Sequence, residues 1–91
     1  MTYVDREKNS YGRMKMCHLF ADSLEELHDM ALNKLHLHRS WFQEEKTPHY
    51  DICQAKRKIA VAKGAIEIDR HKAVEIIHEW RERKINKSGE E

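Results

Sequence analysis

The sequence predicts a small α/β domain of the α+β kind, with two layers in which about three mixed strands are packed by three helices. Three observations predict it: two strand-like stretches near the N-terminus, three later stretches with helical periodicity, and a short apolar stretch at 65–68. The order strand, strand, helix, loop, helix, strand, helix places the helices mainly on one side of the sheet.

Two strands are expected near the N-terminus. The first contains Tyr3 and Val4, and the second runs from Met14 to Phe20. Period-two geometry places His18 on one face of the second strand, together with large apolar side chains. The residues between the two strands include three that favour a hairpin turn: Asn9, Ser10 and Gly12.

The first helix is predicted to begin with a capping box. Ser23 is followed three residues later by Glu26, a spacing that satisfies free amide groups at a helix start. At 100° per residue an apolar stripe follows: Leu24, Leu27, Ala31 and Leu35. His28 lies beside this stripe, on the side expected to face the sheet.

Residues 37–50 show neither helical nor strand periodicity and are expected to form a long loop. Ser40 and Gln43 have the residue types that cap a single helical turn, which would carry Trp41 and Phe42. Two aromatic rings in a loop pack on the core or contact a ligand.

Two helices and one strand complete the predicted order. Asp51 and Gln54 repeat the capping-box pattern, and Gly64 is of the type that ends a helix. The expected stripe of this helix is Ile52, Ala55, Ile59 and Ala62. After the strand at 65–68, Asp69 caps a last helix with the stripe Ala73, Val74, Ile77 and Trp80. We expect a single domain over 1–86 and a flexible tail over 87–91.

Composition excludes several classes of function. A net charge of +1 on 91 residues argues against nonspecific nucleic-acid binding. No stretch approaches the roughly 20 apolar residues that cross a bilayer. Two thiols without metal or disulfide spacing favour a cytoplasmic protein. P-loop, dinucleotide-binding, HExxH, CxxC and GxSxG motifs do not occur in the sequence.

The seven histidines are the main candidates for chemistry. Ordinary roles explain four of them: His71 and His78 on the polar side of the last helix, His36 and His38 near a helix end. The other three, His18, His28 and His49, fall at inward-facing positions. Together with Asp51 they offer donor types that bind zinc, although their spacing is not that of a zinc motif. A zinc-dependent hydrolase is one alternative; the leading hypothesis needs no cofactor.

The leading hypothesis is a small-ligand module that binds a phosphate-bearing, nucleotide-like molecule. Lys56 and Arg57 would meet the negative charge, and a helix start at Asp51 would add free amide groups. The aromatic faces of Trp41 and Tyr50 would stack on a ring, and Gln43 would contribute a hydrogen bond. Binding alone would make the protein a sequestering or sensing protein. If His49 acts as an acid or base, with His18 as a second catalytic candidate, the protein would be a phosphoesterase.

A third hypothesis has no small ligand. Trp41, Phe42 and the basic second helix would form a protein-binding surface, for example in an inhibitor of a host factor. One-sided coverage of the sheet would leave a face or an edge exposed, which predicts a homodimer.

Four segments of the chain form an ordered set of motifs: HLFADSLEELHDMA at 18–31, WFQ at 41–43, HYD at 49–51 and AKGAIEID at 62–69. Together they resemble the domain of unknown function 4031 family, small proteins of bacteria and their phages. The stretch at 44–48 is a small expansion relative to the family, and the last helix departs from its usual ending. The resemblance implies no activity, but it implies that the matching polar positions belong together: His18, Asp22, His28, Gln43, His49, Tyr50, Asp51 and Arg57. It also implies a phage or mobile-element origin.

Overall fold

The computed structural model describes residues 1–11, 14–44 and 47–89. Its strands are β1 (Thr2–Val4), β2 (Asn9–Tyr11), β3 (Met14–Ala21), β4 (Phe42–Gln43), β5 (His49–Cys53) and β6 (Ile66–Glu67). Its α-helices are α1 (Leu24–His28), α2 (Gln54–Ala62) and α3 (Arg70–Gly89). A π-helical segment (Asp29–Lys34) continues α1, and a 3-10 turn (Arg39–Trp41) precedes β4.

The six strands found in the described residues form one mixed sheet with the order β4-β5-β3-β1-β6, and β2 pairs with β3 beside this path. The β1–β6 pair is parallel, whereas the other pairs are antiparallel. The predicted α+β class is confirmed. The number of strands is larger than the expected three, because short pairings at β2, β4 and β5 carry weak sequence signals.

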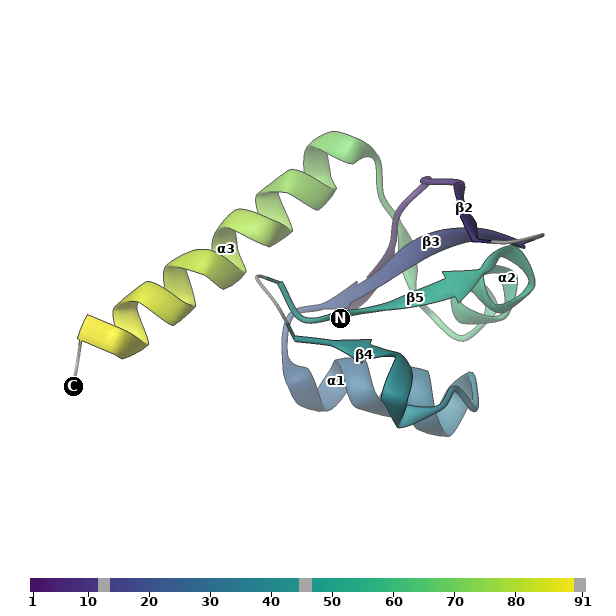
Figure 1. The fold of residues 1–91 in the computed structure, drawn as a ribbon, viewed down its shortest axis with the longest axis horizontal. Helices are drawn as coiled ribbons and strands as arrows, with labels where there is room; N and C mark the ends of the chain where they lie inside the picture. The colour runs from purple at the N-terminus through teal and green to yellow at the C-terminus, as the bar shows by residue number, and fades with distance from the viewer. Residues whose placement is uncertain (12–13, 45–46, 90–91) are drawn as a thin grey trace.

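Helices cover both faces of the sheet, not mainly one. Alternate residues of β3 point to opposite faces, so Leu19 joins a core with α1 and α2 while Phe20 joins a second core with α3. Figure 1 shows α3 on one side of the strands and α1 on the other. The second core contains Trp80, whose indole N–H donates to the carbonyl of Ala21 at 2.9 Å.

Local signals at three helix ends are confirmed. The Ser23 hydroxyl accepts a hydrogen bond from the Glu26 amide at 3.2 Å. The carboxylate of Asp69 accepts one from the Lys72 amide at 2.9 Å. Gly64 follows α2 with a φ of 109°, a left-handed conformation that favours glycine.

The predicted capping box at Asp51 is wrong. Asp51 lies inside β5, and α2 begins at Gln54 after Cys53, which makes no side-chain capping bond. Buried Tyr50 and Ile52 alternate with partly exposed neighbours, which is the period of a strand. Pairing with β3 supplies hydrogen bonds to this backbone, so the long-range contact prevails over the local cap.

Two other local predictions change. Asn9 and Ser10 belong to β2 and not to a turn, whereas Gly12 lies outside the described residues. The long loop is interrupted by the 3-10 turn and by β4, which pairs with β5. The expansion expected at 44–48 includes residues 45 and 46, which lie outside the described residues.

The buried sides of the later helices also differ from the predicted stripes. In α3, Ala73, Ile76 and Trp80 are buried, whereas Val74 is 43% exposed. In α2, Ala60 is buried and Ile59 is exposed, and Ile52, which was assigned to the same stripe, lies in β5. The flexible tail at 87–91 stays a prediction; helix α3 continues to Gly89, and residues 90 and 91 lie outside the described residues.

Candidate functional site

Three of the predicted site residues converge on the face of the sheet that α3 covers. His18 in β3 is paired in register with Asp51 in β5, and His49 lies two residues before Asp51 on the same face. One ligand atom from each of the three side chains lies within 4.8 Å of the other two. The Nε2 atoms of His18 and His49 are 3.7 and 3.6 Å from the same Asp51 oxygen, Oδ1.

Each of the two imidazole rings is oriented by an interaction at its Nδ1 atom. The Nδ1 of His18 lies 2.6 Å from Oδ2 of Asp5, and the Nδ1 of His49 lies 2.8 Å from the carbonyl oxygen of Thr47. Because the carbonyl and the ionised carboxylate only accept, each Nδ1 carries the proton. In the neutral ring, Nε2 therefore presents a lone pair to the shared centre.

The carboxylate of Asp51 is held in the same way. Its Oδ2 accepts a hydrogen bond from the side-chain amide of Gln43 at 2.8 Å, which leaves Oδ1 facing the histidines. Three acceptor atoms thus face one another, while the second polar atom of each group is already bonded. Outer hydrogen bonds of this kind are typical of metal ligands, because they fix the orientation of the donor atoms.

Asp5 is the most buried charged group of this arrangement, with 3% of its surface exposed. Its other oxygen, Oδ1, accepts hydrogen bonds from the backbone amides of His18 at 2.9 Å and Glu7 at 3.3 Å. Burial opposes ionisation of this carboxyl, but the hydrogen bonds from His18 outweigh it and hold the pKa of Asp5 below its usual value. The Asp5 carboxylate in turn raises the pKa of His18.

His28 does not join the other histidines. Its Nδ1 lies 2.7 Å from the hydroxyl oxygen of Tyr50, and its ring packs against Phe42 with the centroids 4.6 Å apart. Tyr50 itself is fully buried in the core formed with α1 and α2, so its face is closed to a ligand. Burial lowers the pKa of His28 and raises the pKa of Tyr50.

The two basic residues of the expected phosphate site have structural partners instead. Lys56 donates to the carbonyl of Leu35 at 2.7 Å. Arg57 donates to the backbone carbonyl of Asp5 and to the carboxylate of Glu67, both at 2.9 Å. The charged groups that the phosphate hypothesis assigned to a ligand are therefore already bonded within the protein.

The remaining predicted positions lie apart from the histidine–carboxylate cluster. Trp41 lines a separate hollow with Lys56 and Cys53, and 38% of its surface is exposed. Asp22 accepts a hydrogen bond from the Tyr3 hydroxyl at 3.1 Å. The structure therefore does not assemble the combination of Trp41, Tyr50, Lys56 and Arg57 that the phosphate hypothesis used.

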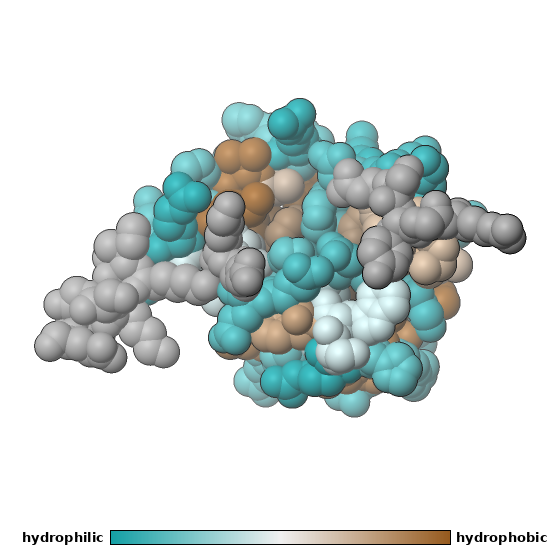
Figure 2. Space-filling model, viewed as in Figure 1, coloured by the Kyte–Doolittle hydropathy of each residue, from teal (hydrophilic) through white to brown (hydrophobic). Residues whose placement is uncertain are grey.

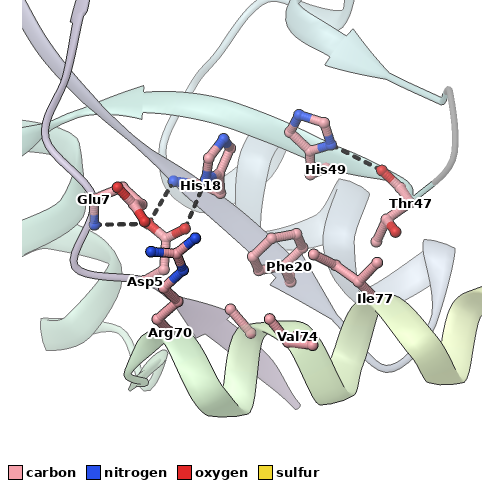
Figure 3. Close-up of a pocket in the computed structure, with 10 residues that line it drawn as sticks. Asp5, Glu7, His18, Phe20, Thr47, His49, Arg70, Val74 and Ile77 are labelled. Atoms are coloured by element: carbon pink, nitrogen blue, oxygen red, sulfur yellow. Dashed lines mark hydrogen bonds and ion pairs between the residues drawn. The ribbon is translucent and has the colours of Figure 1, made fainter.

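A cavity of about 370 Å³ opens beside the cluster, between the sheet and α3 (Figure 3). Its polar lining residues are Asp5, Glu7, His18, Thr47, His49 and Arg70. Its apolar lining residues are Phe20, Ala73, Val74 and Ile77. Sequence reasoning missed Asp5, Thr47 and Arg70 because their roles depend on contacts between separate elements. The one local signal was an acidic residue directly after the first strand.

The fold and this cluster define a small α+β protein with a histidine–carboxylate site at the surface of a mixed sheet. The sequence model described as "Protein of unknown function (DUF4031)" matches residues 2–80, so the chain belongs to that family. Comparison with curated proteins and with solved structures gave no match. Among the described residues, no helix is both long enough and apolar enough to cross a membrane.

Proposed function

We propose that the protein is a zinc-dependent hydrolase whose metal ligands are His18, His49 and Asp51. The observation that carries the proposal is the convergence of three donor atoms: Nε2 of His18 and Nε2 of His49 lie 3.7 and 3.6 Å from Oδ1 of Asp51. The second polar atom of each of these side chains is already bonded. Two imidazole nitrogens and one carboxylate oxygen form a donor set that suits zinc.

Three protein ligands suit catalysis better than a purely structural role. Structural zinc sites in proteins use four protein ligands, whereas catalytic sites use three and keep a position for water. When bound, the metal would lower the pKa of that water and so supply a nucleophile at neutral pH. The cavity beside the cluster is lined by His18 and His49 and would give a substrate access to this position.

The chain's own residues would orient the site. Asp5 and Thr47 hold the imidazole rings, and Gln43 holds the carboxylate, so the donors would not need to reorganise when the metal binds. In this proposal His18 and His49 are ligands, and the acid–base role considered for them from the sequence is given up.

Zinc titration of chelator-treated protein tests the proposal. We expect one zinc ion per chain by calorimetry and by native mass spectrometry. The variants His18→Ala, His49→Ala and Asp51→Asn should each weaken binding by at least tenfold, since each loses one of three ligands. The variant His28→Gln is the matched control, because this histidine lies against Tyr50 outside the cluster. Equal zinc affinity in wild type and all three ligand variants would exclude the site.

Several sequence-based expectations about partners stay predictions. The homodimer, the host-protein partner that would contact Trp41, and the cytoplasmic location each need their own measurement. Sedimentation of the purified chain tests the first, and recovery of a partner with wild type but not with Trp41→Ala tests the second.

A further inference from the structure

The cavity beside the proposed zinc ligands combines one cationic side chain with an apolar wall. Figure 3 shows Arg70 reaching from the first turn of α3 toward Asp5 and His18. The Asp5 carboxylate is already bonded to His18, and Arg70 makes no hydrogen bond or ion pair with the described part of the chain. Its guanidinium group is therefore available to an anion from solution.

The apolar wall lies on the other side of the same cavity. Phe20 from the sheet and Val74 and Ile77 from α3 line it, and Figure 3 shows these three side chains grouped together. Val74 is 43% exposed although it lies at a position where the sequence predicted core packing. Figure 2, in the view of Figure 1, shows a hydrophobic area over the region where the N-terminal part of α3 lies, next to hydrophilic residues. A bound apolar group would cover this surface.

We infer that the substrate is a small phosphate monoester with an aromatic or aliphatic alcohol portion; this inference rests on the proposed hydrolase function. Arg70 would bind phosphate oxygens through its planar pair of N–H donors. The alcohol portion would lie along Phe20, Val74 and Ile77. A volume of about 370 Å³ is at the small end of ligand pockets, which suits a small molecule and not a polymer.

The reaction balances with water as the only co-reactant. The oxygen of water attacks phosphorus, and the bond from phosphorus to the alcohol oxygen breaks. The leaving oxygen takes a proton that originates from the water. The products are the free alcohol and inorganic phosphate.

Phenyl phosphate is a suitable probe for this inference. With the zinc-loaded protein, binding is measured by calorimetry and turnover by release of phenol. The variant Arg70→Gln should weaken phenyl phosphate binding about 10- to 100-fold, the range for loss of a charged hydrogen-bond partner. The matched control is Arg81→Gln, an exposed arginine of the same helix that does not line the cavity.

Two further variants separate charge from apolar contact. Glu7→Gln removes one negative charge from the cavity lining and should leave affinity unchanged or tighten it. Val74→Ser should weaken phenyl phosphate about threefold and leave inorganic phosphate unchanged, because only the former has an apolar group. Benzoate serves as the carboxylate comparison and should bind more weakly than phenyl phosphate.

The outcomes distinguish the two proposals. If wild type fails to bind zinc, both the hydrolase and its substrate class are overturned. If zinc binds normally but Arg70→Gln and Arg81→Gln bind phenyl phosphate equally well, only the substrate class is overturned. Tighter binding of benzoate than of phenyl phosphate, or no phenol release, would also overturn it.

Discussion

Each side chain of the cluster is oriented by a hydrogen bond at its second polar atom, which distinguishes the cluster from a chance grouping of polar side chains. The Nε2 atoms of His18 and His49 lie 3.7 and 3.6 Å from Oδ1 of Asp51, which is too long for a hydrogen bond. When both rings are neutral, these three atoms are acceptors with no donor among them. Acceptors that face one another repel unless a cation lies between them. At the scale of single residues, this arrangement motivates the metal proposal more than the number of histidines does.

Replacement of Asp5 should weaken metal binding without removal of a ligand. Asp5→Asn lowers the basicity of His18 and loosens the orientation of its ring, so zinc affinity should fall about 10- to 100-fold. The exposed carboxylate of Asp29 provides the control variant Asp29→Asn, with circular dichroism to verify folding. Equal affinities in the two variants would show that Asp5 does not orient the ligand.

The two thiols should differ strongly in reactivity. Cys17 is fully buried, and burial raises its pKa to about 12, so very little thiolate forms at neutral pH. Cys53 is partly exposed. In the folded protein, a thiol reagent should modify Cys53 first, and Cys17 only after unfolding in denaturant.

Mass spectrometry of the labelled peptides measures this order. Preferential modification of Cys17 under native conditions would contradict the buried position of β3. The denatured protein, in which both thiols react, provides the reference.

At the scale of elements, two helix ends adopt the left-handed conformation, one at a glycine and the other at a histidine. Gly64 follows α2 with a φ of 109°, whereas His36, which follows the π-helical segment, has a φ of 55°. A Cβ atom added at Gly64 would meet no atom within 4 Å. Substitution there tests backbone conformation alone, because it introduces no steric overlap.

Substitutions at these two ends should therefore change stability in opposite directions. Gly64→Ala should lower the free energy of unfolding by about 1 kcal/mol, because an L-residue is strained at this φ. His36→Gly should raise it by about 0.5 kcal/mol, since relief of the strain exceeds the added flexibility of the unfolded chain. Urea denaturation of both variants measures the changes. A gain in stability for Gly64→Ala would contradict the left-handed helix end.

At the scale of the whole molecule, α3 links stability to the proposed site. The same helix buries Trp80 in the second core and contributes Arg70, Val74 and Ile77 to the cavity. This helix packs against part of the sheet face that carries the proposed ligands (Figure 1). Loss of helix docking should therefore open the cavity as well as weaken the fold.

The two tryptophans test the contribution of α3. Trp80→Ala should lower the free energy of unfolding by about 3 kcal/mol, because it removes a buried ring and leaves the Ala21 carbonyl without its donor. Trp41→Ala removes a ring that is 38% exposed and should cost less than about 1 kcal/mol. Denaturant unfolding followed by circular dichroism compares them. Equal losses would mean that α3 does not pack as described.

Local chemistry at helix ends was readable from the sequence. Ser23, Asp69 and Gly64 act within a few residues of their own positions, so the residue types alone determine what they do. The same reasoning failed at Asp51, which has a similar capping pattern with Gln54 but lies inside β5. A strand depends on a partner elsewhere in the chain, and a pattern of three residues carries no information about that partner.

The sequence by itself determined the α+β class, most helix ends, and the inward direction of His18. The tertiary structure alone decided which inward-facing groups meet. It joined His49 and Asp51 to His18, excluded His28, and added Asp5 and Arg70. The physical reason is that periodicity sets the direction of a side chain along its own element, whereas distances between elements follow from strand register and helix docking.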